Sequence, residues 1–344
     1  MQPIPLIRLS MITPIIQFLQ GIGSPIEKRM EQMNVPLAAL ATPETPLPVM
    51  TLLQFIHQAA DREGIENLGM VMHDAVSITG TGMFGALISQ SCTLYDALKR
   101  TCEISHLAMS ESGDKVWLIE EAEQVWFCQS FPFYHPRDVY INHSIVYSLL
   151  LQLSVVRRSL GDRWQPSELH LPTAPSPALA AAAQLWDTRI HYYKPFTAIQ
   201  IPRDVLATPM GQTSTHRSTV NPSSLDTWQA TAPALDFVGS LEQTLSTLLL
   251  EGYPSIELTA DVIGSSIRTL QRTLSKQGLS YSRLIDKVRY QKAMTIMQDP
   301  DVPLIEVAYA LGYSDPGNFS HAFKRWTGVT PLRFRQHYAS QRYG

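Results

Sequence analysis

The spacing of hydrophobic residues changes along the chain, and its clearest pattern lies near the C-terminus. From residue 256 to residue 338, apolar side chains recur every three or four positions, which is the period of an amphipathic helix. Turns at Gly264 and at Gly312 interrupt this period, and each separates a short helix from a longer one. The pattern predicts two helix-turn-helix units, over residues 256–277 and 304–327, joined by one long helix.

The second helix of each unit has a polar outer face that suits contact with DNA. Arg and Gln carry paired hydrogen-bonding groups that match the edges of guanine and adenine in the major groove. We therefore predict that bases are read by the outward residues of the two helices, Arg268, Gln271, Arg272, Asn318 and His321. We predict phosphate contacts from two serines at helix N-termini and from two cations, Ser266, Ser314, Lys324 and Arg325.

Charge is distributed unevenly along the chain. The whole sequence has 27 Lys and Arg against 30 Asp and Glu, a formal net charge of −3. Residues 240–344 hold 12 basic and 9 acidic residues, whereas residues 1–239 hold 15 and 21. A basic C-terminal part on an acidic partner is the asymmetry expected when only one part of a protein contacts phosphates.

Upstream of this region, helical and β-type patterns alternate. Helical spacing predicts helices over residues 13–20, 51–63, 84–91, 94–109, 140–160 and 177–185. A β-hairpin is expected from residues 115–120 and 124–129, which flank an acidic turn. Further strands are expected at residues 168–171, 190–193 and 198–201. Such mixed order predicts an α+β domain.

Residues 211–233 separate the two patterns. They are rich in Ser, Thr and Pro and hold hardly any charge beyond Arg217 and Asp226, a composition typical of a flexible linker. The predicted organisation is therefore an α+β domain over residues 1–210, a linker over 211–233, and an all-α domain over 234–344.

Composition narrows the class of protein further. Hydrophobic residues make up 44% of the chain, yet no run approaches the ~20 apolar residues of a membrane span. The start of the chain contains prolines and lacks the basic segment of a signal peptide. Cys92, Cys102 and Cys128 form no CxxC pair, so we expect reduced, buried thiols in a cytoplasmic protein.

Several enzyme-like signals have simpler interpretations. Gly80 to Gly85 spell GxGxxG, but a dinucleotide site needs a preceding strand and repeated βαβ units, and the pattern here favours a turn before a helix. Each cysteine is expected to be a core residue rather than a nucleophile. The histidines lack the spacing of metal ligands, among them His135, His143, His170 and His191. We therefore predict no catalytic residue, no metal and no cofactor.

The C-terminal motifs resemble the DNA-binding domain of AraC/XylS-type transcription regulators. The agreement covers about the last hundred residues and runs through Ile305–Ala308, Leu311–Asp315, Asn318–Ser320, Ala322–Arg325, Gly328 and Thr330-Pro331. The run Ser266–Arg272 looks like that family's first recognition helix. His321 stands where the family usually has Arg, and Pro316-Gly317 opens the second recognition helix. We therefore expect the first unit to read more of the DNA sequence than the second.

The N-terminal part is similar, more loosely, to the "arabinose-binding" type of sensor domain that is fused to some of these regulators. The likeness covers about residues 15–210 and rests on the order of elements with Phe84-Gly85, Leu94–Leu98 and Ile201-Pro202. It implies effector sensing and dimerisation without naming the effector. Aromatic residues could line the effector pocket, although core packing is the simpler role for any one of them: Trp117, Trp126, Phe131, Tyr140 and Tyr192.

These observations predict a bacterial, cytoplasmic activator of transcription that responds to a small-molecule effector. Its expected partners are double-stranded DNA, RNA polymerase and a second copy of the chain. Helix 281–298 is expected to hold the two recognition helices in successive major-groove segments, about one helical turn apart. One alternative is a DNA-tethered enzyme of the repair type, which needs a reactive cysteine or a metal set in the N-terminal half. Another is an architectural DNA-binding protein, and ligand-dependent transcription would separate it from a regulator.

Overall fold

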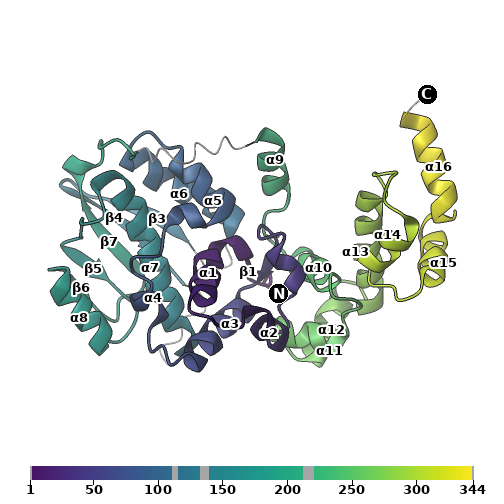
Figure 1. Ribbon diagram of the computed structural model, residues 1–344, viewed down its shortest axis with the longest axis horizontal. Helices are drawn as coiled ribbons and strands as arrows, with labels where there is room; N and C mark the ends of the chain where they lie inside the picture. The colour runs from purple at the N-terminus through teal and green to yellow at the C-terminus, as the bar shows by residue number, and fades with distance from the viewer. Residues whose placement is uncertain (1, 111–114, 132–138, 212–220, 343–344) are drawn as a thin grey trace.

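The computed structural model describes residues 2–110, 115–131, 139–211 and 221–342. An α/β part and an all-helical part lie side by side along the long axis of the molecule (Figure 1). Within the described residues, no helix combines the length and the apolarity that crossing a membrane requires.

The N-terminal part contains a five-stranded sheet with the order β3-β4-β7-β5-β6. Only β5 and β6 are parallel; the other neighbours are antiparallel. The strands are β3 (Val116–Glu120), β4 (Gln124–Gln129), β5 (Glu168–His170), β6 (Arg189–His191) and β7 (Thr197–Pro202). The hairpin and the later strands that the period-two pattern predicts are confirmed.

The longest helix of this part, α7, contacts α3, α4, α6 and β7. The helices are α1 (Thr13–Gly21), α2 (Ile26–Gln32), α3 (Val49–Arg62), α4 (Leu68–Val71), α5 (Gly82–Ser89), α6 (Leu94–Ala108), α7 (Val139–Leu160) and α8 (Pro177–Leu185). The α+β prediction is confirmed. Gly161, at φ +90°, follows the last residue of α7 in the left-handed conformation that favours glycine.

A second, two-stranded sheet was not predicted from the sequence. Strand β1 (Leu6–Arg8) pairs antiparallel with β2 (Pro46–Pro48), and a short 3₁₀ helix, η1 (Leu9–Ile12), follows β1. Two of the three residues in β2 are prolines, which lack the N–H that a strand donates. Proline-rich composition is therefore not a signal for a strand, although the chain forms an edge strand here.

The expected linker contains a helix, α9 (Pro222–Ala230). Asn221 caps it by accepting a hydrogen bond from the N–H of Ser223, and Pro222 occupies the first turn, where a missing N–H costs nothing. Trp228 of α9 is only 2% exposed. The prediction of an irregular segment is therefore wrong for this stretch, because one buried tryptophan anchors a helix in an otherwise polar sequence.

The C-terminal part is all-helical, as predicted. Its helices are α10 (Phe237–Leu248), α11 (Ile256–Val262), α12 (Ile267–Lys276), α13 (Tyr281–Ile296), α14 (Leu304–Ala310), α15 (Pro316–Thr327) and α16 (Pro331–Arg342). Helices α11 and α12 form the first helix-turn-helix unit, and α14 and α15 form the second. Helix α13 joins them. Although Ile305 is apolar, it is 48% exposed, and the buried face of α14 is formed by Val307 and Ala308.

Arg289 of α13 fixes the second unit against the first. Its side chain is buried and lies 4.0 Å from the ring centroid of Tyr313 and 4.9 Å from that of Tyr253. Its guanidinium donates to the carbonyl oxygens of Leu311 and Gly312, at 2.9 and 3.1 Å. Because Tyr253 lies in the loop between α10 and α11, one cation connects the turn of the second unit to the first.

The two parts of the chain share a hydrophobic core. Ile4 and Leu6, at the N-terminus, pack in one cluster with Leu241 and Leu245 of α10. The N–H of Ile4 donates to the hydroxyl of Ser240 at 2.9 Å. The β1–β2 sheet therefore belongs to both parts, so the boundary between them is not a simple cut in the sequence.

We expect Gly312→Ala to destabilise the C-terminal part more than Gly264→Ala does. Both glycines have positive φ, +73° and +65°, and alanine in the left-handed region costs about 1–2 kcal/mol at either position. A Cβ at Gly264 meets nothing within 4 Å, whereas one at Gly312 lies 2.8 Å from the backbone of Gly252. That overlap adds about 1–3 kcal/mol. Urea unfolding at constant m-value measures both losses, and equal losses would contradict the packing of the turn against Gly252.

Candidate DNA interface and ligand cavity

The first recognition helix, α12, presents its predicted base-reading residues to solvent. Leu270 and Leu274 are buried on its inner face. Arg268, Gln271 and Arg272 are exposed, and their spacing of three and four places them on one face. They remain candidates for contacts with DNA bases.

Ser266 stands at the N-terminus of α12 and caps the helix. Its hydroxyl oxygen accepts from the N–H of Thr269 at 3.1 Å and its proton points to the Thr269 hydroxyl at 2.9 Å. The hydroxyl is therefore engaged within the protein. What the helix end still offers to a phosphate is its free backbone N–H groups.

The second recognition helix, α15, has the same plan with a different N-terminus. Phe319 and Phe323 are buried, while Asn318, His321 and Lys324 are exposed at intervals of three. Asp315 caps the helix by accepting from the N–H of Gly317 at 3.0 Å, and the exposed Ser314 precedes it. The N-terminus of a helix usually attracts a phosphate, but at α15 this position is already occupied by the carboxylate of Asp315.

Arg325 differs from the other predicted phosphate contacts because it already has a partner in the protein. Its guanidinium lies 2.8 Å from the carboxylate of Asp286 on α13, although the side chain is 65% exposed. This ion pair joins α15 to the helix that connects the two units. The sequence alone did not indicate it, because Asp286 and Arg325 lie 39 positions apart.

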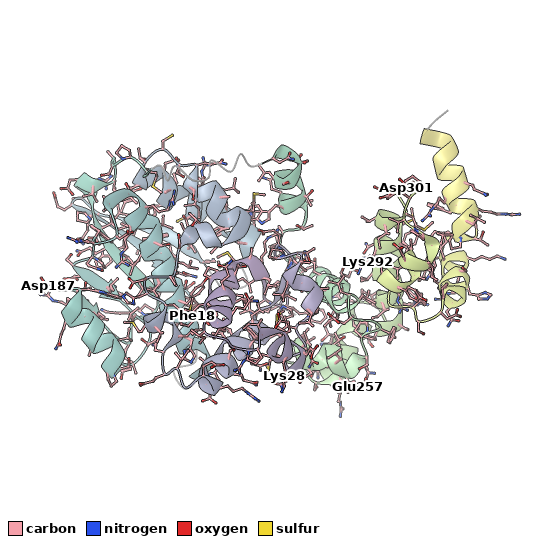
Figure 2. The ribbon with its side chains drawn as sticks, viewed as in Figure 1. Phe18, Lys28, Asp187, Glu257, Lys292 and Asp301 are labelled. Atoms are coloured by element: carbon pink, nitrogen blue, oxygen red, sulfur yellow. The ribbon has the colours of Figure 1, made fainter. Side chains whose placement is uncertain are left out.

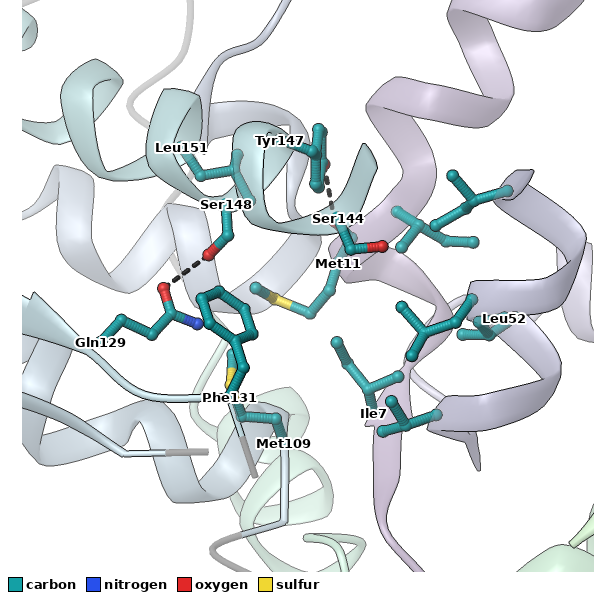
Figure 3. Close-up of a pocket in the computed structure, with 14 residues that line it drawn as sticks. Ile7, Met11, Leu52, Met109, Gln129, Phe131, Ser144, Tyr147, Ser148 and Leu151 are labelled. Carbon is teal, nitrogen blue, oxygen red and sulfur yellow. Dashed lines mark hydrogen bonds between the residues drawn. The ribbon is translucent and has the colours of Figure 1, made fainter. Parts of the chain in front are cut away.

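The N-terminal part contains a cavity of about 90 Å³ between η1, α3 and α7 (Figure 3). Its lining is mostly apolar and carries no charged side chain among the described residues. The lining residues are Ile7, Met11, Ile12, Val49, Leu52, Leu53, Ile56, Met109, Gln129, Phe131, Ser144, Tyr147, Ser148 and Leu151. An apolar cavity with a few convergent polar groups is the usual form of a small-molecule site.

Four of these residues bring polar atoms to the cavity wall. The hydroxyl of Ser148 donates to the amide oxygen of Gln129, and the phenol of Tyr147 donates to the carbonyl oxygen of Met11 at 2.7 Å. Burial raises the pKa of Tyr147, so this phenol stays protonated. The buried hydroxyl of Ser144, in contrast, has no hydrogen-bond partner among the described residues.

The five aromatic residues proposed for an effector pocket do not meet at this cavity. Phe131 lines it. Trp117 packs edge-on against Phe196, and Trp126 stacks on His170. Side chains alternate along β4, so Trp126 and Cys128 lie on one face of the sheet and Gln129 lies on the other. Trp117 pairs with Cys128 and shares its face. Both tryptophans therefore lie on the opposite side of the sheet from Gln129. Tyr192 does not line the cavity, and the side chain of Tyr140 lies outside the described residues.

Strand β1 separates the cavity from the C-terminal part. Ile7 lines the cavity, whereas Leu6 packs into the core around α10. Arg8 points away from the cavity to the linker helix: it is fully buried, lies 5.0 Å from the ring centroid of Trp228 and donates to the carbonyl oxygen of Trp228. Burial lowers the pKa of Arg8 to about 10, partly offset by Glu44, so the guanidinium stays charged at neutral pH.

Glu44 explains the GxGxxG motif without a cofactor. Its carboxylate accepts from the N–H of Met83 at 2.9 Å, at the first turn of α5, and from the indole N–H of Trp228 at 2.8 Å. A Cβ at Gly82 would lie 2.1 Å from this carboxylate, and Gly82 has φ +61°. Because Gly82 has no side chain, the carboxylate of Glu44 can reach the N-terminus of α5. A cofactor phosphate would need this same position.

The expectation that the histidines are scattered is wrong for two of them. His170 and His191 are cross-strand partners on β5 and β6, with ring centroids 5.1 Å apart. Together with Glu168 they offer three ligand atoms within 4.8 Å of one another. The carboxylate of Glu168 is already engaged, by Arg189 at 3.1 Å and by His191 at 3.3 Å. Strand register, which spacing along the chain does not reveal, brings this cluster together.

The cysteines fit a structural role more closely than a catalytic one. Burial raises the pKa of Cys102 and of Cys128 to about 12, which disfavours the thiolate that a nucleophile requires. Cys92 is exposed, so the expectation that all three are buried is wrong at this position. It directly precedes Thr93, which caps α6, and therefore lies in a surface turn.

Two protein-family models match the chain. Residues 23–210 match the arabinose-binding domain of AraC transcription regulators, N-terminal, and residues 259–337 match a helix-turn-helix domain. The first match alone covers more than half of the sequence.

Individual relatives are also regulators. An ornithine utilization regulator of Pseudomonas aeruginosa is 23% identical over 304 residues, which is 86% of this chain and 86% of that protein. The HTH-type transcriptional regulator VqsM of the same organism is 34% identical over 101 residues, or 28% of this chain and 31% of that one. The crystal structure of the transcriptional regulator CdpR from Pseudomonas aeruginosa covers 78% of this chain and 86% of its own, at 20% identity and a TM-score of 0.34.

Lys292 of α13, labelled in Figure 2, is only partly exposed. Its ammonium group has no hydrogen-bond partner within the described ranges of the chain, and burial lowers its pKa from 10.5 to about 8. Between pH 8 and pH 10.5 the unfolded chain therefore binds more protons than the folded chain, so stability rises with pH across this window.

We expect Lys292→Met to stabilise the folded protein at pH 7 by about 1–2 kcal/mol, because one pKa unit corresponds to about 1.4 kcal/mol and partial exposure reduces the full effect. The advantage over the unmodified protein should shrink as pH rises towards 10.5. Urea unfolding at pH 7, 8.5 and 10 measures it. Lys287→Met, which removes an exposed lysine paired with Glu242, is the control and should show no such trend. A pH-independent advantage at position 292 would contradict the burial of a charged ammonium group.

Proposed function

We propose that a small molecule controls DNA binding by this chain, which belongs to the AraC family of transcription regulators. The cavity of the N-terminal part is the proposed effector site. One observation carries the proposal: strand β1 borders this cavity with Ile7 and the C-terminal core with Leu6. A molecule that moves Ile7 must therefore act on a strand that the DNA-binding part also holds.

The proposed DNA complex places α12 and α15 in successive major-groove segments on one face of the duplex. Such segments are about 34–36 Å apart. Helix α13 and Arg289 fix the distance between the two helices, since Arg289 bonds to the turn of the second unit and stacks on the loop of the first. A rigid spacing favours sites in which two half-sites lie one helical turn apart.

We assign base reading chiefly to Arg268, Gln271 and Arg272 of α12, with Asn318 and His321 of α15 adding to it. Lys324 is the exposed cation assigned to phosphate, and the N-terminal end of α12 at Ser266 is assigned to it as well. Ser314 is assigned to phosphate through its exposed hydroxyl, because the carboxylate of Asp315 already caps α15. Arg325 is assigned a shared role, because its ion pair with Asp286 positions α15 while most of its side chain stays exposed.

A second route between cavity and DNA-binding part runs along α3. Leu52, Leu53 and Ile56 of this helix line the cavity. In the same helix, the hydroxyl of Thr51 donates to the carbonyl oxygen of Val262 at 2.8 Å, at the end of α11. Both routes, β1 and α3, reach the first helix-turn-helix unit or its supporting helix. We therefore propose that the effector shifts the population of DNA-competent arrangements of this unit.

The remaining partners follow from this role. A regulator of this kind acts on bacterial DNA in the cytoplasm, and an activator contacts RNA polymerase. We propose that two copies of the chain bind one regulatory site, because a repeated DNA site increases affinity when both copies engage. Comparing the mass of the protein–DNA complex with that of the free protein tests this.

We infer that the protein is not an enzyme. The relatives that cover most of the chain are regulators by name, and the pKa values of Cys102 and Cys128 are raised rather than lowered. The competing DNA-tethered enzyme would use the N-terminal part for catalysis. Turnover of a small molecule by the full chain, lost on substitution in that part, would favour the enzyme.

We expect Arg272→Ala and Lys324→Ala to weaken DNA binding in different ways. An Arg paired with guanine contributes about 1–3 kcal/mol of discrimination at one base pair. Arg272→Ala should therefore relax preference at one or two adjacent positions. Lys324→Ala should weaken binding equally on all sequences and reduce the salt slope by about one. A binding-site selection at fixed salt, followed by titrations at two salt concentrations, measures both.

His321→Ala should cost less than Arg272→Ala, because a neutral imidazole offers one N–H donor where a guanidinium offers five. Arg62→Ala, which removes an exposed charge from α3, controls for loss of net charge. If His321→Ala abolishes sequence preference while Arg272→Ala preserves it, the assignment of reading to the first unit is wrong.

A further inference from the structure

The chemistry of the cavity wall defines the class of molecule that the cavity can hold. We propose that it takes a small, uncharged molecule with an apolar body and a single hydrogen-bonding group, such as a short-chain alcohol or ketone. This rests on the proposed function, in which the cavity is the effector site. It deepens that function by excluding sugars and charged metabolites from the site.

Size sets the first limit. The cavity measures about 90 Å³. A cavity of about 150 Å³ lined by apolar side chains holds benzene, which has six non-hydrogen atoms. At three-fifths of that volume, this cavity holds a body of about four non-hydrogen atoms, or five where its wall adjusts. The flexible thioether side chains of Met11 and Met109 form part of its wall, and they can adjust to slightly different shapes.

Charge sets the second limit. The described lining contains no Lys, Arg, Asp, Glu or His. Arg8, the charged residue of β1, faces the linker helix. Its guanidinium donates to the carbonyl oxygens of Leu107, Glu44 and Trp228. An ion in this cavity would lose its hydration without gaining a countercharge, at a cost far above that of a neutral group.

Hydrogen-bonding capacity sets the third limit. Tyr147 and Ser148 already donate to Met11 and Gln129, so the donors and acceptors left on the wall are few. A sugar carries several hydroxyl groups, and each one buried without a partner costs about 1–3 kcal/mol. The cavity therefore rejects a sugar, although the matching family model is described as an arabinose-binding domain.

The position of the single polar group follows from Ser144. Its hydroxyl is buried and has no partner in the part of the chain that the structure describes. Ser144 precedes Ser148 by one helical turn on the same face of α7, and Ser148 holds the amide oxygen of Gln129, which leaves the amide NH₂ as a donor (Figure 3). The Ser144 hydroxyl points away from Gln129, towards the side of the cavity where Leu52 lies (Figure 3). One ligand oxygen on that side can therefore bond to the Ser144 hydroxyl.

The test is methyl NMR of the full-length protein labelled at methionine. Met11 and Met109 line the cavity, and Met297, in the core of the second helix-turn-helix unit, serves as the distant reference. The probes are 1-pentanol, pentanoate, L-arabinose and L-ornithine. We expect 1-pentanol to shift the signals of Met11 and Met109 in a saturable way and much more than that of Met297. Pentanoate should bind at least about tenfold more weakly, since its body is the same and its charge lacks a partner.

Two variants locate the polar end of the ligand. Ser144→Ala should weaken 1-pentanol binding about three- to tenfold and yet raise the melting temperature of the ligand-free protein, because it removes an unsatisfied buried hydroxyl. Ser154→Ala, in the same helix, removes a hydroxyl that bonds to Leu151 and Ile78. This control should lower the melting temperature and leave 1-pentanol binding unchanged. Weaker binding in both variants, or in neither, would overturn the assignment of Ser144.

DNA binding separates this inference from the proposed function. The same samples are titrated with the selected DNA site, with and without saturating 1-pentanol. If 1-pentanol shifts Met11 and Met109 without changing DNA affinity, the ligand class stands and the proposed control of DNA binding fails. If pentanoate, arabinose or ornithine binds at these methyl groups as tightly as 1-pentanol, or if 1-pentanol does not bind there, the ligand class is overturned.

Discussion

The three residues of β1 face two ways, and the relation between the two parts of the protein depends on this alternation. Successive side chains of a strand point to opposite faces, so Ile7 reaches the cavity while Leu6 and Arg8 reach the core of α10 and the linker helix. The strand is too short to bend independently at each residue. Ser110 holds Leu6 by three hydrogen bonds, two through its hydroxyl and one through its backbone N–H. A displacement on one face is therefore a displacement on the other.

Helical and strand periods were sufficient to predict most elements, because burial on one side imposes a period of 3.6 or 2 on any sequence. The two helix-turn-helix units are the clearest example: Leu270, Leu274, Phe319 and Phe323 are all buried as their spacing indicates. The same patterns concealed β2 and α9. In β2, Pro46 and Pro48 give the sequence the composition of a loop. In α9, one buried apolar residue, Trp228, anchors the helix, and apolar residues do not recur with the helical period.

The sites were harder to predict than the elements, because they depend on contacts between residues that are distant in sequence. Exposure of Arg268, Gln271 and Arg272 follows from one helix alone and could be predicted. The cavity draws its wall from β1, η1, α3, β4 and α7. Of the aromatic residues that were proposed for it, Phe131 lines it, whereas Trp117 and Trp126 lie on the other face of the sheet. An arginine in a helix is usually expected to face solvent. Only the tertiary fold shows that Arg289 is buried between two tyrosines.

Coupling between cavity and DNA is tested most directly by a double-mutant cycle on the affinity of the full chain for its DNA site. Leu53→Phe fills the cavity. Thr51→Val removes the hydrogen bond from α3 to Val262, and Ser240→Ala removes the hydrogen bond from Ile4, next to β1, to α10. Together these two substitutions remove the side-chain hydrogen bonds that connect α3 and β1 to the DNA-binding part. If β1 and α3 transmit occupancy, Leu53→Phe should change affinity about fivefold or more in the intact chain. In the Thr51→Val/Ser240→Ala background the same substitution should have little effect. An equal change in both backgrounds, or no change in either, would contradict control of DNA binding from this cavity.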